Sequence, residues 1–408
     1  MDRADLTAMF LAAVAAVDPA ELVEAELRRG AFERGDSPVV VLALGKAAAG
    51  MVWGAQRALG DSLTGVAILE SAADLPRGVT GIVGGHPVPD ERSLAAGERL
   101  LEAAAGAPAG AIVLCLLSGG GSALAEVPAA GLGIEDVAEV NRLLLGSGAP
   151  ISEVNIVRRA LSRIKGGQLG AAVASPRLLT LAISDVGSAG PATIASGPTL
   201  ALDSAGETAL EVVTRWGLAE DLSPRVTAAL GEVEAPPRRS HDLTVLADGS
   251  TAATAAAAAA ERLGLVAEIS ERELTGEAGA EARRVVADAQ GRSADVVVYH
   301  GETTVTVTGS GRGGRNHEAA LAAAIVMAGK DGTFLAAGTD GIDGSSGGAG
   351  AVVDGMTAAR GLEMGLNPAA LLADNDSAAF FDAVPGRIVT GPTGTNVADI
   401  WMVSGAGA

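Results

Sequence analysis

Short apolar runs recur along the first half of the chain, and segments with helical periodicity separate them. The runs predict buried strands at Pro38–Leu44, Val66–Leu69, Ile82–Val83, Ala111–Leu117 and Leu178–Ile183. The segments between them predict helices, namely one that ends near Leu59, then Glu91–Ala105, Glu135–Leu145 and Glu153–Leu169. Strands that alternate with helices are typical of a mostly parallel sheet with helices on both faces.

A stretch with two prolines and no periodicity, Gly231–Ser240, interrupts this pattern and predicts a domain boundary. After it, the pattern predicts strands at Leu243–Ala247 and Thr333–Ala337 and a helix at Thr251–Leu263. It also predicts a β-hairpin formed by Asp295–Tyr299 and Thr303–Thr308. The pattern therefore predicts an α/β protein of two domains, residues 1–232 and residues 240–408.

Composition narrows the classes of function. Hydrophobic residues make up 48% of the 408 residues and charged residues 19%, which is typical of a globular chain. A net charge of −20 and an aromatic content of 2% argue against binding to nucleic acid or anionic membranes. Near the N-terminus, Asp2 and Asp5 favour an amphipathic helix over a signal peptide, and no run is long enough to span a bilayer. We therefore expect a cytoplasmic protein, with its only cysteine, Cys115, in the core.

Two glycine-dense turns predict anion binding. Gly309–Gly314 precedes a helix and is followed by Arg315, and the Ser118–Ser122 turn follows an apolar strand. Such turns expose backbone N–H groups at a helix N-terminus, and arginine adds a planar, charged fork. Lys46, directly after the first strand, could reach a phosphate in the same way. Two such turns suggest a substrate with more than one anionic group, held between domains.

Two familiar nucleotide motifs fit poorly. The region around Lys46 is not a Walker A loop, because Val40 stands where its first glycine would fall and Ala47 replaces Ser or Thr. Gly309-x-Gly311-x-x-Gly314 matches the dinucleotide fingerprint, but the strand Thr333–Ala337 carries no acidic residue for the ribose.

Several polar residues lie in loops that follow predicted strands. Asp185, Asp340 and Asp343 could hold Mg²⁺ or orient a hydroxyl, or they could simply be turn residues. His86 lies in a proline-stiffened loop, where a substrate contact and structural packing are both open. No HExxH motif or Cys/His cluster predicts catalytic zinc.

A longer set of motifs occurs in a fixed order. It comprises GKAAAGM (Gly45–Met51), GGHPVPDERS (Gly84–Ser93), LSGGGSAL (Leu117–Leu124), NIVRRALSRIKGGQL (Asn155–Leu169), SDVGSAGPATIASGPT (Ser184–Thr199), GRGGRNHE (Gly311–Glu318), AAGTDGIDG (Ala336–Gly344) and TGPTGTNVADI (Thr390–Ile400). These motifs resemble the glycerate 2-kinase family, whose C-terminal part is called the MOFRL domain. The resemblance covers about residues 38–403, with the MOFRL region at about 295–403.

The resemblance implies a Rossmann-like N-terminal domain, a mixed α/β C-terminal domain and an active site in the cleft between them. It also implies transfer of the γ-phosphoryl group of ATP to the 2-hydroxyl of D-glycerate with a divalent cation. The family's catalytic lysine and arginine correspond to Lys46 and Arg315. Acidic residues that the family usually has after Val186 and Gly344 are absent, and His317 replaces a common Gln.

The expected cofactors are ATP and Mg²⁺, the expected partners are small molecules, and a homodimer is one expected assembly. The assigned residues are catalytic Lys46, Arg315 and Asp340; nucleotide-binding Ser118, Gly119, Gly120, Gly121, Ser122, Gly313 and Gly314; substrate-binding His86, Arg158, Lys165, Asn316, Glu318, Asp343, Thr395 and Asn396; and metal-binding Asp185. Two alternatives remain open: an NAD(P)-dependent hydroxypyruvate reductase, a label that some family members carry, and a non-catalytic sugar-acid sensor.

Overall fold

The computed structural model describes residues 1–29, 35–200, 208–231 and 242–405. The chain folds into two compact units. One unit is Pro19–Leu246, called the parallel-sheet unit, and the other combines Met1–Asp18 with Ala247–Ala408, called the mixed-sheet unit. The expected boundary segment Gly231–Ser240 lies outside the described residues, apart from Gly231.

The parallel-sheet unit is built on a six-stranded sheet with the order β3-β2-β1-β4-β5-β6. Its strands are β1 Val39–Leu44, β2 Leu63–Leu69, β3 Val79–Val83, β4 Ile112–Leu117, β5 Arg177–Ile183 and β6 Asp242–Ala247. Its helices are α2 Pro19–Arg28, α3 Ala48–Leu59, α4 Glu91–Ala105, α5 Gly121–Leu124, α6 Ile134–Ser147, α7 Ile151–Ala160, α8 Gln168–Ala172, α9 Ala209–Arg215 and α10 Pro224–Gly231, with 3₁₀ turns at Gly187–Ala189 and Pro191–Ser196. Strands β1 to β5 pair in parallel, as the sequence pattern predicts.

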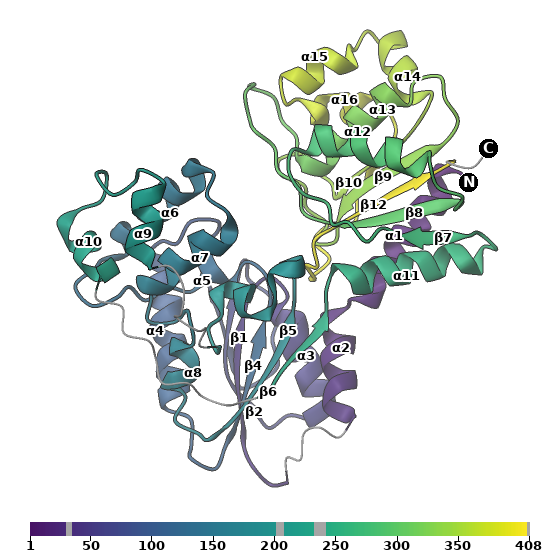
Figure 1. The fold of residues 1–408 in the computed structure, drawn as a ribbon. Coiled ribbons are helices and arrows are strands. Elements are labelled where there is room, and N and C mark those ends of the chain that lie inside the picture. The colour runs from purple at the N-terminus through teal and green to yellow at the C-terminus, as the bar shows by residue number, and fades with distance from the viewer. Residues whose placement is uncertain (30–34, 201–207, 232–241, 406–408) are drawn as a thin grey trace. The chain divides into compact units, whose positions relative to one another are not determined.

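Alternate residues of each strand pack on opposite faces of this sheet. Leu42 and Cys115 belong to a core that includes Leu100 of α4. Helices α2 and α3 lie on the other face (Figure 1). Helices α6, α7, α9 and α10 form a separate apolar cluster around Val157 and Val212. The predicted two-sided cover of the sheet and the core position of Cys115 are thus confirmed.

The mixed-sheet unit has a second six-stranded sheet, with the order β11-β10-β9-β12-β8-β7. Its strands are β7 Ala267–Ile269, β8 Val296–Gly301, β9 Thr333–Gly338, β10 Gly350–Asp354, β11 Arg387–Ile388 and β12 Asp399–Ser404. Its helices are α1 Arg3–Ala16, α11 Gly249–Arg262, α12 Ala278–Ala289, α13 Arg315–Val326, α14 Thr357–Glu363, α15 Pro368–Ala373 and α16 Ser377–Ala383. Helices α12 and α13 cover one face and α1 and α11 the other (Figure 1). Because β7 and β8 are parallel whereas β12 pairs antiparallel with β8 and β9, the expected mixed sheet is confirmed.

Two local predictions are wrong. Thr303–Thr308 does not form a hairpin with β8, because β7 and β12 already flank that strand and Thr304 instead bridges to Glu277. The predicted helix Glu153–Leu169 ends at Ala160 as α7, and α8 begins only at Gln168. Here the Ser162 hydroxyl accepts from the amides of Ile164 (3.1 Å) and Lys165 (3.2 Å), a local pairing that competes with helix continuation.

The units also differ from the expected domains, residues 1–232 and 240–408, at two elements. Helix α1 belongs to the mixed-sheet unit, where it packs on α11, β9 and β10. Strand β6 extends the sheet of the parallel-sheet unit next to β5. Within the described residues, no single helix has the length and hydropathy of a membrane span; only the broken pair α1–α2 reaches them jointly.

Candidate active site

The carboxyl ends of β1 and β4 bring Lys46 next to the Ser118–Ser122 turn. These two strands are neighbours at the point where the strand order reverses, which is where open α/β sheets bind ligands. The Lys46 amide donates to the carbonyl of Gly119 at 2.9 Å. A Cβ atom at Gly45 would lie 2.3 Å from Ser118 Oγ, so only glycine permits this approach of the two turns.

Inside the turn, the serine hydroxyls are engaged by the protein itself. Ser118 is buried, and its Oγ accepts from the amide of Ala47 at the start of α3 (3.0 Å). Ser122 Oγ lies 2.6 Å from Ser196 Oγ. The two hydroxyls thus have partners within the protein, the backbone of Gly119–Gly121 is the part of the turn that could meet an anion, and nucleotide binding by Ser118–Ser122 stays a prediction.

His86 follows β3 and contacts Glu70, which follows β2. The atoms His86 Nδ1 and Glu70 Oε1 are 3.0 Å apart. The hydrogen bond from His86 lowers the pKa of Glu70; partial burial raises it, and the charge of Lys46 lowers it further. Glu70 thus joins Lys46 and His86 at the carboxyl edge of the sheet. The sequence analysis missed Glu70, although its position directly after a strand could have indicated it.

Asp185 follows β5 at the same edge and is partly buried. Among the described residues, no group of three or more His, Cys, Asp or Glu side chains could hold a metal ion. The described residues therefore do not form a metal site from protein side chains alone. One carboxylate such as that of Asp185 could hold Mg²⁺ only together with phosphate oxygens and water, and metal binding by Asp185 stays a prediction.

Both cations predicted for the glycerate carboxylate already have partners within the protein. Lys165 is 1% exposed and pairs with Glu126, which also accepts from Ser162 Oγ at 2.6 Å. Burial lowers the pKa of Lys165, and Glu126 raises it in part. Arg158 donates through Nε to Asn141 Oδ1 at 2.6 Å, and burial lowers its pKa as well. Arg158 thus ties α7 to α6, and Lys165 ties the loop after α7 to Glu126; glycerate binding by either residue stays a prediction.

The adjacent Arg159 is also held by hydrogen bonds within the protein. It donates to the backbone carbonyls of Ala192 (3.2 Å) and Ser196 (3.4 Å). Burial lowers its pKa to about 10, a value at which the guanidinium is still charged at neutral pH.

In the mixed-sheet unit, Arg315 is the first residue of α13 and is held by two carboxylates. It contacts Asp399 at the start of β12 through Nε (2.6 Å) and Nη2 (2.9 Å), and Glu302 through Nη1 (2.7 Å). Burial lowers the pKa of Arg315, but Asp399 and Glu302 more than offset this, so its pKa lies above the ordinary value. Asp399 is fully buried, and burial raises its pKa against the opposing effect of Arg315.

The amides of the Gly309–Gly314 turn do not form an open anion cradle. Gly309 N donates to Asn375, Ser310 N to the Asp374 carboxylate and Arg312 N to the Asp376 carboxylate, at 2.9–3.0 Å. The expectation of free N–H groups is therefore wrong for this part of the turn, because a distant acidic segment supplies the acceptors. Gly313 N donates to Ser345 Oγ at 3.2 Å, and nucleotide binding by Gly313 and Gly314 stays a prediction.

Four predicted substrate contacts are parts of the fold. Asp343 is buried and accepts from the amides of Asn316 (3.0 Å) and His317 (2.8 Å), which caps α13. Asn316 is fully buried between Asp399 and Trp401, Glu318 accepts from Asn375 Nδ2 (2.8 Å), and Thr395 donates to the Val17 carbonyl (2.9 Å). These side chains hold α13 and the segment before β12 in place.

Asp340 and Asn396 are only partly buried. Asp340 follows β9, and a Cβ atom at Gly338 would lie 3.1 Å from Asp340 Oδ1 and 3.2 Å from Asp399 Oδ1. Asp340 therefore lies near the Arg315–Asp399 pair, as its assignment to the site requires. Asn396 Oδ1 accepts from the amide of Ala398 at 3.4 Å.

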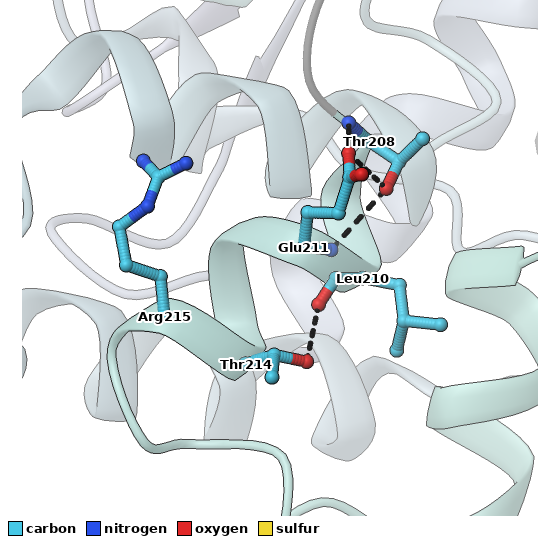
Figure 2. A pocket seen from close by; sticks show the side chains of 5 residues that line it. All are labelled: Thr208, Leu210, Glu211, Thr214 and Arg215. Atoms are coloured by element: carbon cyan, nitrogen blue, oxygen red, sulfur yellow. Dashed lines mark hydrogen bonds between the residues drawn. The ribbon is translucent and has the colours of Figure 1, made fainter.

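Figure 2 shows a surface depression on α9, lined by Thr208, Leu210, Glu211, Thr214 and Arg215. Its polar groups serve the helix itself: the Thr208 amide donates to Glu211 at 2.7 Å, and Thr214 Oγ1 donates to the Leu210 carbonyl at 2.7 Å. None of the ordered motifs of the sequence falls in it. We therefore place the candidate site at the strand ends and not in this depression.

Comparison with known proteins agrees with the motif order. Residues 5–231 match the family model "Domain of unknown function (DUF4147)", and residues 295–399 match the MOFRL family. The D-glycerate 2-kinase of Thermotoga maritima is 37% identical over 89% of this chain and 89% of its own length. A protein from Agrobacterium vitis named as a hydroxypyruvate reductase is 39% identical over 98% of this chain and 93% of its own length.

A solved structure gives the same result. The crystal structure of the glycerate kinase from Thermotoga maritima has a TM-score of 0.86 and 33% identity, over 98% of this chain and 99% of that chain. The extent of these matches covers both units and the motifs that carry Lys46 and Arg315. The chain, which combines a DUF4147 region with a MOFRL region, therefore belongs to the glycerate 2-kinase family.

Proposed function

We propose that this protein transfers the γ-phosphoryl group of ATP to the 2-hydroxyl of D-glycerate, giving 2-phosphoglycerate and ADP. The observation that carries the proposal is the position of Lys46 beside the glycine turn at the point where the parallel strand order reverses. Family membership supplies the substrate class, since a relative that matches most of the chain is named D-glycerate 2-kinase.

Phosphoryl transfer depends mainly on positioning and on neutralising negative charge. In the proposal, Lys46 and Arg315 supply this charge, and the backbone of Gly119–Gly121 binds phosphate oxygens. Asp185 would hold Mg²⁺, which when bound neutralises charge on the phosphates. Because Lys165 is buried against Glu126, Arg158 stays the candidate of this motif for the glycerate carboxylate, since its hydrogen bond to Asn141 uses Nε. Asp340 stays a candidate for orienting the hydroxyl.

The reductase alternative has less support in the structure. The dinucleotide fingerprint requires turn amides that can meet a pyrophosphate, whereas Gly309–Arg312 donate to Asp374, Asn375 and Asp376. The strand that follows α13, Thr333–Gly338, also contains no acidic residue that could bind the ribose. The cytoplasmic location and the homodimer stay predictions.

Product identification tests the proposal. The purified full chain is incubated with ATP, Mg²⁺ and D-glycerate, and the products are followed by ³¹P NMR and by ADP formation. We expect phosphate on the 2-oxygen and no change in nicotinamide absorbance with NAD(P)H and hydroxypyruvate. Phosphate on the 3-oxygen would overturn the regiochemistry, and nicotinamide oxidation without ADP formation would favour the reductase. Binding of glycerate without ADP formation would indicate a sensor.

A further inference from the structure

Three turns at the carboxyl ends of neighbouring strands bring Glu70, His86 and Lys46 together. The strands β3, β2 and β1 are adjacent, and these residues follow them by one to three positions. Glu70 and His86 are joined by the 3.0 Å contact between Oε1 and Nδ1. Their side chains are 37% and 27% exposed, so the pair is held by the fold and still reaches solvent.

The second ring nitrogen of His86 lies toward the glycine turn. A Cβ atom built at Gly120 would lie 3.6 Å from His86 Nε2 and 3.2 Å from Lys46 Cγ. Gly120 has a φ of +81°, a left-handed conformation that glycine adopts without strain. Nε2 and the stem of Lys46 therefore approach the same point of the turn from two sides. A small ligand at this turn would meet both side chains.

We propose that His86 is the catalytic residue that accepts the proton of the substrate hydroxyl, and that Glu70 is the positioning residue that holds its imidazole. The proposal rests on the kinase function proposed above. A carboxylate that accepts from Nδ1–H leaves Nε2 as the basic atom, which is the arrangement that activates hydroxyl groups in acid–histidine pairs. His317 has a similar partner in Asp343, but its ring is fully buried and cannot reach a ligand.

Atoms and electrons balance in this step. Nε2 takes the hydroxyl proton while the glycerate oxygen forms a bond to the γ-phosphorus of ATP. The bond from that phosphorus to the β,γ-bridging oxygen breaks, and ADP leaves with the electron pair. The imidazolium is stabilised by Glu70 and returns its proton to solvent. Lys46 stays charged and offsets the negative charge of the phosphoryl group.

The charged groups around His86 set the expected pH dependence. They are Glu70 after β2, Lys46 after β1 and, at the start of α4, the Asp90–Arg92 pair, which is joined at 2.7 Å. Only the neutral imidazole can accept the proton. We therefore expect kcat to be low at acid pH and to rise to a plateau at higher pH.

The experiment compares four variants of the full chain: His86→Gln, Glu70→Gln, Glu70→Leu and, as the test of the rival base, Asp340→Asn. We expect His86→Gln to lower kcat by about 10²–10⁴-fold with a much smaller change in KM for glycerate, and to remove the acid limb of the kcat profile. Glu70→Gln can still accept from Nδ1–H and should keep more activity than Glu70→Leu. His300→Gln, on β8 of the other unit, is the matched control and should behave like the parent.

A measurement on the parent needs no variant. ¹⁵N NMR of histidine-labelled protein should show His86 in the Nδ1–H tautomer at neutral pH, and Glu70→Leu should abolish this preference. Near-parental kcat in folded His86→Gln, an effect on KM alone, or the Nε2–H tautomer in the parent would each overturn the proposal. Loss of kcat in Asp340→Asn but not in His86→Gln would assign the base to Asp340. Absence of ADP formation by the parent would instead overturn the kinase function itself.

Discussion

Among single residues, Lys46 and Arg315 match the family's catalytic lysine and arginine, but they differ in how much the fold depends on them. Lys46 is partly buried in the turn after β1. Arg315 neutralises Asp399, which has no exposed surface. A change at Lys46 therefore reports mainly on chemistry, whereas a change at Arg315 reports on chemistry and on folding.

We expect Lys46→Met to lower kcat by about 10²–10³-fold, equal to roughly 2.7–4 kcal/mol, because a preorganised charge near the transferred phosphoryl group is lost. ATP binding should weaken less than kcat falls, and the melting temperature should stay near that of the parent. Steady-state kinetics and thermal melting check this. Lys330→Met, at an exposed lysine, is the matched control. A folded Lys46→Met enzyme with parental kcat would remove Lys46 from the mechanism.

We expect Arg315→Met to lose activity and also about 3–5 kcal/mol of unfolding free energy, because it leaves the buried carboxylate of Asp399 unpaired. Chemical denaturation at pH 7 measures the loss. In the double variant Arg315→Met/Asp399→Asn, most of the stability should return while activity does not. A stability of the single variant equal to that of the parent would show that the pair is not buried in solution.

The stability of Arg315→Met should also depend on pH. The pKa of Asp399 already lies above its ordinary value because of burial, and removal of Arg315 takes away the group that lowers it. When the pKa of a carboxyl is higher in the folded than in the unfolded protein, ionisation of that carboxyl destabilises the fold. The loss grows as the pH rises from the unfolded pKa, about 3.9, through the folded pKa. Lowering the pH from 7 toward 5 should therefore recover part of the stability lost by Arg315→Met, relative to the parent, and should not do so in the double variant.

Among the helices and strands, α13 is held at its N-terminus by a loop that follows β9. Asp343 accepts from the amides of Asn316 and His317 and contacts His317 Nδ1 at 2.7 Å. The negative charge also complements the positive end of the helix dipole. Arg315 is the first residue of this helix, so the cap fixes the position of the proposed catalytic guanidinium.

Loss of a helix N-cap typically lowers the free energy of unfolding by about 0.5–2 kcal/mol. We expect Asp343→Ala to lower it by about 2 kcal/mol or more, because buried His317 loses its partner too. Asp343→Asn keeps one acceptor oxygen and should cost less. Urea denaturation of both variants gives the comparison, and kcat should fall in the same order as stability. If Asp343→Ala were as stable as the parent, the cap would not be what orders the start of α13.

Across the molecule as a whole, the few lysines of this acidic chain lie in very different surroundings. The net charge is −20, and the lysines are Lys46, Lys165 and Lys330 alone. Lys330 is exposed, Lys165 is buried against Glu126, and Lys46 lies in the candidate site. Sequence position alone assigns Lys165 to a family motif, but its burial assigns it to the stability of the parallel-sheet unit.

We expect Lys165→Met to lower the free energy of unfolding by about 3–5 kcal/mol, because Glu126 is 0% exposed and loses its ion partner. Replacement of both partners, Lys165→Met/Glu126→Leu, should restore much of this loss. Denaturation of the full chain measures both, with Lys330→Met as the exposed-lysine control. A large rise in KM for glycerate with unchanged stability in Lys165→Met would instead return Lys165 to the substrate site.

Local sequence patterns specify the class of fold, the strands β1 and β4 with their glycine turns, and the family. A buried strand needs a continuous apolar run, and a turn that passes close to another backbone needs glycine. The same patterns place Lys46 at the start of a helix after a strand. They mislead where a segment has no free neighbour to pair with, as at Thr303–Thr308 beside the fully flanked β8.

Which polar groups meet depends instead on tertiary packing. Arg315 and Asp399 are separated by 84 positions, Lys165 and Glu126 by 39, and Gly309 and Asn375 by 66. Each contact depends on strand order and on how helices pack against the sheets, which no local pattern specifies. A buried polar group must find a partner wherever the fold places one. That requirement pairs Asp343, Asn316 and Lys165 with partners within the fold, whereas the order of the strands places Glu70 beside His86.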